Sequence, residues 1–192
     1  MEHVPDQDEG LIRRAREGDR AALGALVRRH QGAVYRFALT LTHGEAAAED
    51  VLQETFIAAT QNLDGYRGEG SFRSWLFTIA KRAWFRSARR RAGEPERHES
   101  LETLGARAGW GAVDDGFEAR LAQREALTNA FARLAEEDRE VLFLRDVEGF
   151  SGDETAAVLG LSAAAMKSRL HRARLRLAAE LREEGGDDGA RS

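Results

Sequence analysis

The sequence predicts an all-α protein made of two small helical domains that are joined by a flexible acidic linker. Alanine, leucine, arginine and glutamate, which favour helices, dominate the 192 residues. No Asn-Gly or Asp-Gly pair lies between alternating apolar runs, so the usual hairpin signals are missing. Apolar residues recur at helical spacing before residue 92 and again after residue 116. A chain of this length has core enough for two small domains.

The first domain is expected to span residues 8–91, after a disordered stretch of residues 1–7. Its first helix runs from about Asp8 to Gly18, and a second helix begins after Asp19, whose carboxylate can cap it. Core positions recur at helical spacing along this second helix: Ala22, Leu26, His30, Ala33, Val34, Phe37 and Leu41.

A third helix, about Glu45 to Leu63, has two different faces. One face is expected in the core and carries Val51, Leu52, Phe56 and Ala59. The other face is polar and carries Asp50, Gln53 and Glu54. Taken alone, these residues are typical of an ordinary solvated helix face. A glycine-rich loop follows at residues 64–70, and Ser71 can cap the next helix.

The helix from Ser71 to Arg91 has aromatic residues on two faces. At about 100° per residue, a core stripe contains Phe72, Trp75, Leu76, Ile79 and Ala83, and the roughly opposite face contains Phe77, Lys81, Trp84, Phe85 and Ala88. Residues 81–91 also hold six cations and no acid. Rings that stack bases beside cations that hold phosphates are typical of single-stranded nucleic-acid binding. The alternative is a helix that is sandwiched between two others, with both aromatic faces in the core.

Residues 92–116 are interpreted as a linker, because they lose helical periodicity and contain many glycines and acids. The second domain then spans residues 117–184, with residues 185–192 as a disordered tail. Its first two helices are expected to run from about Phe117, with Leu121, Leu127, Phe131 and Leu134, and from about Glu136 to Glu148, with Val141, Leu142 and Leu144.

The end of the second domain has the pattern of a helix-turn-helix. Ser151 and Glu154 have capping-box spacing, Gly160 ends the short helix that they begin, and Ser162 can cap the next one. A short helix, a glycine turn and a longer basic helix are typical of DNA-binding domains that place the last helix in the major groove.

The last helix is expected to pack through one narrow apolar stripe, formed by Met166, Leu170, Ala173 and Leu177. The outward face contains Ala164, Ser168, His171 and Leu175, with Lys167 and Arg174 on one flank and Arg169, Arg172 and Arg176 on the other. A small polar face with cations along both edges suits a major groove and its two phosphate walls. A solvated basic surface helix is the alternative.

Composition argues against several other classes of protein. The chain has no cysteine, its five histidines show no ligand spacing, and no phosphate loop or nucleophile motif is present, so we expect no catalytic site, metal or cofactor. No leader and no run of about 18 apolar residues occurs, which predicts a cytoplasmic protein without membrane insertion. The net charge of −4 predicts weak DNA binding by the chain alone.

Three stretches together resemble one family. They are residues 48–56 (AEDVLQETF), residues 66–76 (YRGEGSFRSWL), and the segment from Gly149-Phe150-Ser151 through Gly160-Leu161-Ser162 to Met166-Lys167-Ser168-Arg169-Leu170-His171-Arg172-Ala173-Arg174. Over nearly its whole length the chain resembles the extracytoplasmic-function sigma factors of bacterial RNA polymerase. The resemblance implies a sigma region 2 at residues 8–91 and a sigma region 4 at residues 117–184.

The resemblance also implies partners and site residues. Core RNA polymerase would bind region 2 through the coiled coil of its β′ subunit, on Asp50, Gln53 and Glu54, and region 4 through its β flap. The minus-ten promoter element and a flipped base would meet Tyr66, Arg67, Gly68, Glu69, Gly70, Ser71, Lys81, Arg82, Trp84, Phe85, Arg86 and Arg89. The minus-thirty-five element would meet Ser162, Ala164, Ala165, Lys167, Ser168, Arg169, His171 and Arg172. The family is usually held inactive by an anti-sigma factor, so one is expected here.

The function that follows is promoter recognition, promoter melting and transcription initiation together with core polymerase. The rival is a stand-alone helix-turn-helix regulator of duplex operators, which explains the second domain but not the first. The chain departs from many relatives at Lys81-Arg82, at Arg86 and at Ala163-Ala164-Ala165-Met166, so the resemblance does not imply a promoter sequence.

Overall fold

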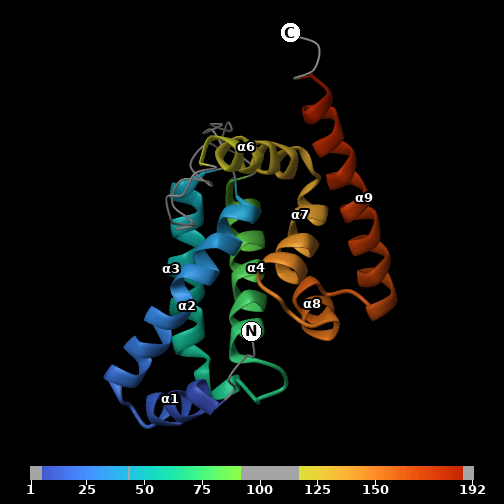
Figure 1. The fold of residues 1–192 in the computed structure, drawn as a ribbon. Helices are drawn as coiled ribbons and strands as arrows, with labels where there is room; N and C mark the ends of the chain where they lie inside the picture. Colours follow the sequence, from blue (N-terminus) through green and yellow to red (C-terminus); the bar gives the residue numbers. More distant parts are fainter. Residues whose placement is uncertain (1–5, 43, 92–116, 188–192) are drawn as a thin grey trace.

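The computed structural model describes residues 6–42, 44–91 and 117–187, which form helices and connecting turns and contain no strand. The first domain contains α1 (Asp6–Arg16), α2 (Arg20–Leu41), α3 (Glu45–Gln61), the short 3₁₀ helix η1 (Leu63–Gly65) and α4 (Phe72–Arg91). The second domain contains α6 (Phe117–Arg133), α7 (Glu136–Leu142), the turn η2 (Phe143–Val147), α8 (Gly152–Leu159) and α9 (Ala163–Asp187). Figure 1 shows α2, α3 and α4 as a bundle, with α7 and α8 beside α4 and α9 on the outside.

The first domain folds around the apolar faces of α2, α3 and α4. Every core position expected along α2 is buried. The carboxylate of Asp19 caps this helix by accepting from the backbone N–H groups of Ala21 and Ala22, at 2.8 and 3.1 Å. From the facing helices, the buried apolar residues are Ala48, Val51 and Ala59 of α3 and Phe72, Leu76, Phe77, Ala80 and Ala83 of α4.

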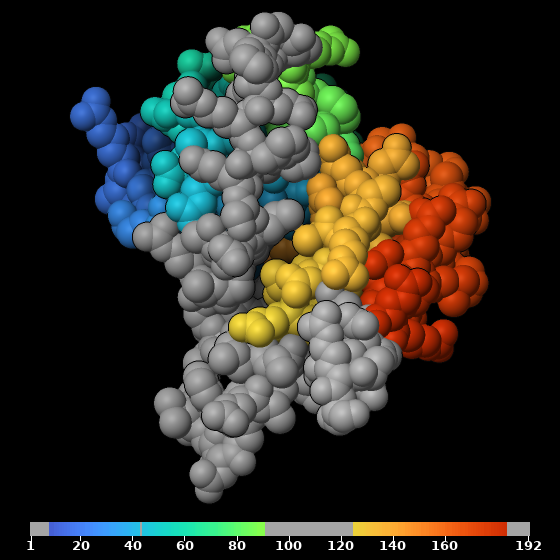
Figure 2. All heavy atoms as spheres, turned by 90° about the horizontal axis from the view of Figure 1, so that it is seen from above, coloured from blue at the N-terminus to red at the C-terminus, as the bar shows by residue number. Residues whose placement is uncertain are grey.

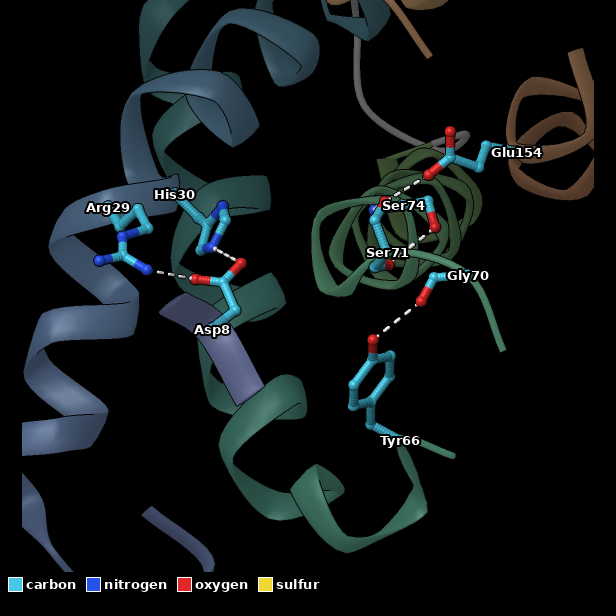
Figure 3. Close-up of polar contacts among 8 residues, drawn as sticks. All are labelled: Asp8, Arg29, His30, Tyr66, Gly70, Ser71, Ser74 and Glu154. Atoms are coloured by element: carbon cyan, nitrogen blue, oxygen red, sulfur yellow. Dashed lines mark hydrogen bonds and ion pairs between the residues drawn. The ribbon is translucent and has the colours of Figure 1, made fainter. Parts of the chain in front are cut away.

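A buried carboxylate attaches α1 to this bundle. Oδ2 of Asp8 lies 3.0 Å from Nε2 of His30, and Oδ1 accepts from Arg29 at 2.7 Å (Figure 3). Burial alone would raise the pKa of Asp8, but the hydrogen bonds to His30 and Arg29 outweigh it and hold that pKa below its ordinary value. The ring of His30 lies edge-on to Phe72, with centroids 5.5 Å apart. Asp8 therefore attaches α1 to α2, and its partner His30 contacts α4 in turn.

The helix ends extend both predicted domains slightly. Helix α1 begins at Asp6 and α9 continues to Asp187, so residues 6–7 and 185–187, which we expected to be disordered, are helical. Turns of a helix that extend from a packed segment gain hydrogen bonds at little further cost in nucleation. The predicted linker, residues 92–116, lies outside the described residues.

The expected helix-turn-helix is confirmed. The hydroxyl of Ser151 accepts from the backbone N–H of Glu154, and the Glu154 carboxylate accepts from the N–H of Ser151, which completes the capping box. Gly160 ends α8 with φ +66°, a conformation that favours glycine. Ser162 then accepts from the N–H of Ala165 at 3.2 Å. The apolar stripe of α9 faces the domain, since Met166, Leu170 and Ala173 are all buried.

The predicted helix from Glu136 to Glu148 is not uniform. Helix α7 ends at Leu142 and continues as η2, a π-helical turn. Gly149, with φ +70°, then turns the chain, and the N–H of Phe150 donates to the carbonyl of Leu144. A π turn rotates the residues that follow it relative to a regular helix, and such turns are frequent at functional sites. Here Phe143, the first residue of the turn, and Phe150, three residues after its end, both contact the first domain.

The two domains share one continuous core. Phe37 of α2 stacks on Phe143 with centroids 5.9 Å apart, and Phe77 of α4 meets Phe150 edge-on at 5.0 Å. Seen from above, the second domain lies directly against the first, near α4 (Figure 2). Our prediction for Phe77 was wrong, because we placed it on the outward face and it is fully buried. The first half of α4 is therefore sandwiched between the rest of the first domain and the second domain.

Candidate nucleic-acid and polymerase interfaces

The loop before α4 has fixed ends and an exposed tip. The phenol of Tyr66 donates to the carbonyl of Gly70 at 2.8 Å, and the Arg16 guanidinium donates to the carbonyl of Leu63 at 3.0 Å and to that of Tyr66. Gly68 and Gly70 have φ values of +76° and +95°. The tip therefore needs glycine for its backbone, and its side chains Arg67 and Glu69 are exposed.

Aromatic rings at the start of α4 pack against this loop. Tyr66 packs against Phe72 and Trp75, with centroids 5.3 and 5.5 Å away. Burial, and the negative charges of Asp8 and Glu9, raise the pKa of Tyr66, so its phenol stays protonated and can donate to Gly70. Tyr66 is half-buried, which makes it a wall of the loop, whereas residues 67–69 are open to a ligand.

The start of α4 is held by both domains. Ser71 caps α4, because its Oγ accepts from the N–H of Ser74 at 3.2 Å, and it donates to Oε1 of Glu154 in α8 (Figure 3). Burial would raise the pKa of Glu154, but hydrogen bonds from Ser71 and Ser151 lower it overall. The Ser71 hydroxyl, which we predicted at the minus-ten surface, is therefore bonded to the second domain.

The second half of α4 presents aromatic rings and cations at the surface. Phe85 is 46% exposed, Trp84 is half-buried against the core, and their centroids lie 4.7 Å apart. Arg82 and Arg89 are exposed. Lys81 differs, because its Nζ lies 2.5 Å from Glu140 of α7 and its side chain is 13% exposed. This end of the helix keeps the chemistry of single-strand binding, while Lys81 marks the border with the second domain.

The outer face of α3 combines acids with an exposed apolar residue. Asp50 and Gln53 are exposed, and Ile57, four residues after Gln53, is 51% exposed on the same face. Glu54 is partly buried and pairs with Arg86 at 3.4 Å and Arg90 at 3.2 Å. The predicted polymerase face therefore adjoins the predicted DNA face through Glu54.

Helix α9 separates its cations into two groups. Arg169, Arg174 and Arg176 pair with acids of their own domain: Glu137, Asp146 and Asp138. Lys167, Ser168, His171 and Arg172 are exposed, as are Ser162, Ala164 and Ala165 at its start. Arg169, which we placed at the minus-thirty-five surface, is directed towards Glu137. The exposed set forms the surface that a duplex would meet.

Within the described ranges, no group of three histidines or acids is placed to hold a metal ion. In the same ranges, no helix is both long and apolar enough to cross a membrane.

Comparison with known proteins agrees with this architecture. The family model Sigma-70 region 2 matches residues 26–94, and Sigma-70, region 4 matches residues 124–177. The RNA polymerase sigma factor CnrH of Cupriavidus metallidurans is 36% identical over 186 residues, which covers 92% of this chain and 95% of CnrH. The ECF RNA polymerase sigma factor EcfG of Rhodopseudomonas palustris is 32% identical, covering 79% and 81% of the two chains. The chain is an extracytoplasmic-function sigma factor of the sigma-70 family.

Solved structures of relatives resemble the sigma factor described here over most of its length. CnrH, in complex with the cytosolic domain of CnrY, has a TM-score of 0.65 and 31% identity, covering 93% of this chain and 99% of CnrH. The sigma factor RpoE from Bartonella quintana, in complex with the anti-sigma factor NepR, has a TM-score of 0.67 and 26% identity, covering 83% and 96%. The region 2 match occupies the first domain, which a stand-alone helix-turn-helix regulator leaves unexplained.

Sequence reasoning about this sigma factor missed several residues. Ile57 was detectable, because it continues the helical spacing of Asp50 and Gln53. Arg36 and Arg73 were not detectable, because their partner Glu148 comes from the second domain and no local sequence pattern predicts that contact.

Proposed function

We propose that this sigma factor is a promoter-specificity subunit without catalytic activity, whose first domain binds core RNA polymerase through the outer face of α3. Asp50 and Gln53 supply polar contacts at the surface, and Ile57 adds an apolar contact between them. Interfaces of this kind gain most of their affinity from a few partly apolar anchors inside a polar rim. The polymerase performs the chemistry, and the complex works in the cytoplasm.

The exposed end of α4 and the glycine loop hold the melted minus-ten strand. Phe85 and Trp84 offer rings to bases, and Arg82 and Arg89 offer cations to the backbone. Unstacking a base costs a few kcal/mol, and stacking on an aromatic ring returns about 1 to 3 kcal/mol. Capture of unpaired bases therefore offsets melting without ATP.

Helix α9 enters the major groove at the minus-thirty-five element. Arg172 and His171 reach base edges, Lys167 meets phosphate, and the small residues Ala164 and Ala165 allow close approach. Arg174 lies on the same helix, but it is paired with Asp146 and is therefore less available to bind a DNA phosphate.

An anti-sigma factor is a further partner of this chain. Two relatives of similar fold were solved as complexes, CnrH with the cytosolic domain of CnrY and RpoE with the anti-sigma factor NepR. We assign region 2 to residues 8–91, a linker to residues 92–116 and region 4 to residues 117–184, with α1 and α9 extending a few residues past these limits.

One observation supports the proposal most strongly: a single chain joins an exposed aromatic and basic helix end to a capped helix-turn-helix. The second of these suits duplex DNA and the first suits unpaired DNA, and an initiation factor needs both.

Run-off transcription on sheared genomic DNA of the source bacterium tests the proposed function. Core polymerase with this chain should start specific transcripts that core polymerase alone does not start. A chain that footprints duplex DNA by itself, yet starts no specific transcript with core polymerase, would support the regulator instead.

A further inference from the structure

The glycine loop, residues 64–70, is mostly exposed. Tyr66 is partly buried, every other residue of the loop is exposed, and Leu63 just before it is buried. Three of the seven residues are glycine, which loses more conformational freedom than any other residue when a chain is ordered. A loop of this composition keeps one shape only if other groups hold its backbone.

Two side chains hold that backbone, and one of them comes from a different helix. Nη2 of Arg16, the last residue of α1, donates to the carbonyl of Leu63 at 3.0 Å and to the carbonyl of Tyr66, and its Nε donates to Leu63 at 3.3 Å. The phenol of Tyr66 donates to the carbonyl of Gly70 at 2.8 Å (Figure 3). The contacts of Arg16 fix the start of the loop, and the contact of Tyr66 fixes its end.

Arg16 can hold the loop because α1 is itself anchored further along its length. Asp8 bonds to His30 and Arg29 of α2, and Ile12 is buried in the core. At 1.5 Å per residue, a helix separates Asp8 from Arg16 by about 12 Å along its axis. In Figure 1, α1 lies at the same end of the bundle as the loop before α4. Helix α1 therefore connects the core rigidly to the loop.

An ion pair does not explain the place of Arg16. The carboxylate of Asp64 lies 3.8 Å from its Nε and is 93% exposed, so this pair contributes little. The shorter contacts of Arg16 are to the backbone carbonyls of Leu63 and Tyr66. A guanidinium that bonds two carbonyls three residues apart constrains the path of the chain, whatever side chains the loop carries.

We propose that Arg16 is a positioning residue for promoter recognition, which holds the glycine loop in the shape that receives an unpaired base. The inference rests on the proposed function of this loop at the minus-ten element. A loop that is ordered before DNA arrives does not lose that freedom on binding, so a base that fits the fixed shape binds more tightly than one that does not. Arg16 therefore acts on the choice of base without contacting DNA.

The test measures base preference with holoenzyme on a promoter found by run-off transcription, in which each position of the minus-ten element carries each of the four bases in turn. A loop-tip variant, Arg67→Ala with Glu69→Ala, identifies the position that the loop reads, because the preference changes there. Arg16→Gln is then compared with Arg13→Gln, which removes the same charge from an exposed position of α1.

The measured quantity is the ratio of transcript from the best base to transcript from the worst base at that position. A purely structural loss lowers the active fraction of protein, which lowers both amounts equally and leaves the ratio unchanged. A direct contact of Arg16 with phosphate would weaken all four promoters uniformly, and the ratio would again stay the same. Only a change in the shape of the loop alters the ratio.

Arg16→Gln should lower this ratio roughly fivefold, while Arg13→Gln leaves it unchanged and neither variant alters the preference in the minus-thirty-five element. A ratio equal to that of Arg13→Gln overturns the proposal. Should circular dichroism show that Arg16→Gln does not fold, Tyr66→Phe carries the same comparison, because it removes the bond to Gly70 and keeps the aromatic ring.

The loop-tip variant separates this proposal from the proposed function. If it alters the preference at one position and Arg16→Gln does not, the positioning role alone is overturned. If it alters no preference, the loop does not read the promoter, and the proposed function of the loop fails together with the positioning role.

Discussion

At the scale of single residues, neighbouring arginines of α9 have different surroundings. Arg172 is exposed, whereas Arg174 pairs with Asp146 at 2.6 Å, and that hydrogen bond raises the pKa of Arg174. A cation already paired within its own domain gains less from DNA, because the first pair must be broken. The two arginines therefore provide a matched test of the recognition helix.

Arg172→Ala should weaken promoter binding by the holoenzyme by about 1 to 3 kcal/mol and relax the preference at one base pair. Arg174→Ala should cost less and leave the sequence preference intact. Competition binding with duplexes that vary in the minus-thirty-five element measures both effects. Equal losses for the two variants would contradict the assignment of Arg172.

Asp8 predicts how the stability of the first domain depends on pH. Its pKa lies below the ordinary value of 3.8 when the chain is folded. The unfolded chain therefore takes up the proton first on acidification, and the contribution of Asp8 is complete above pH 3.8 and is lost as the pH falls through the folded pKa. Asp8→Asn should lower the free energy of unfolding at neutral pH and flatten its decline in acid. Urea unfolding curves across this pH range measure the effect, and an unchanged pH profile in the variant would contradict it.

At the scale of elements, α3 and α4 present two surfaces that meet at Glu54. Asp50→Ala with Gln53→Ala should lower the affinity for core polymerase by at least roughly tenfold, since anchor residues commonly cost more than 1 kcal/mol. Glu17→Ala, an exposed acid in the turn after α1 of the same domain, is the control. Fluorescence anisotropy of the labelled chain with core polymerase measures the affinity. Equal binding by both variants would remove the α3 face from the interface.

The elements also show what local sequence predicts and what it does not. Caps at Asp19, Ser71, Ser151 and Ser162 were predictable, because each is a hydrogen bond between residues two or three positions apart. The core stripe of α4 was predictable from its period. Phe77 was not, because it is buried from two sides, by Phe37 of α2 and by Phe150, which reaches α4 only once the second domain is folded and docked.

At the scale of the whole molecule, the two domains are packed against each other through one shared interface. The interface between the domains joins aromatic contacts, which involve Phe37, Phe77, Phe143 and Phe150, to the ion pairs of Glu148 with Arg73 and of Glu140 with Lys81. Apolar burial holds the domains together, while the ion pairs contribute little net stability once desolvation is counted.

The central claim is that the exposed end of α4 holds the melted strand, and permanganate reactivity of promoter thymines tests it most directly. A promoter found by run-off transcription is incubated with holoenzyme that carries Phe85→Ala, or Leu127→Ala as the control with an equally exposed apolar residue of α6. Since stacking on one ring contributes about 1 to 3 kcal/mol, Phe85→Ala should reduce the reactivity of the melted segment at least roughly fivefold while the holoenzyme still assembles on the promoter. Undiminished reactivity in Phe85→Ala would contradict the claim.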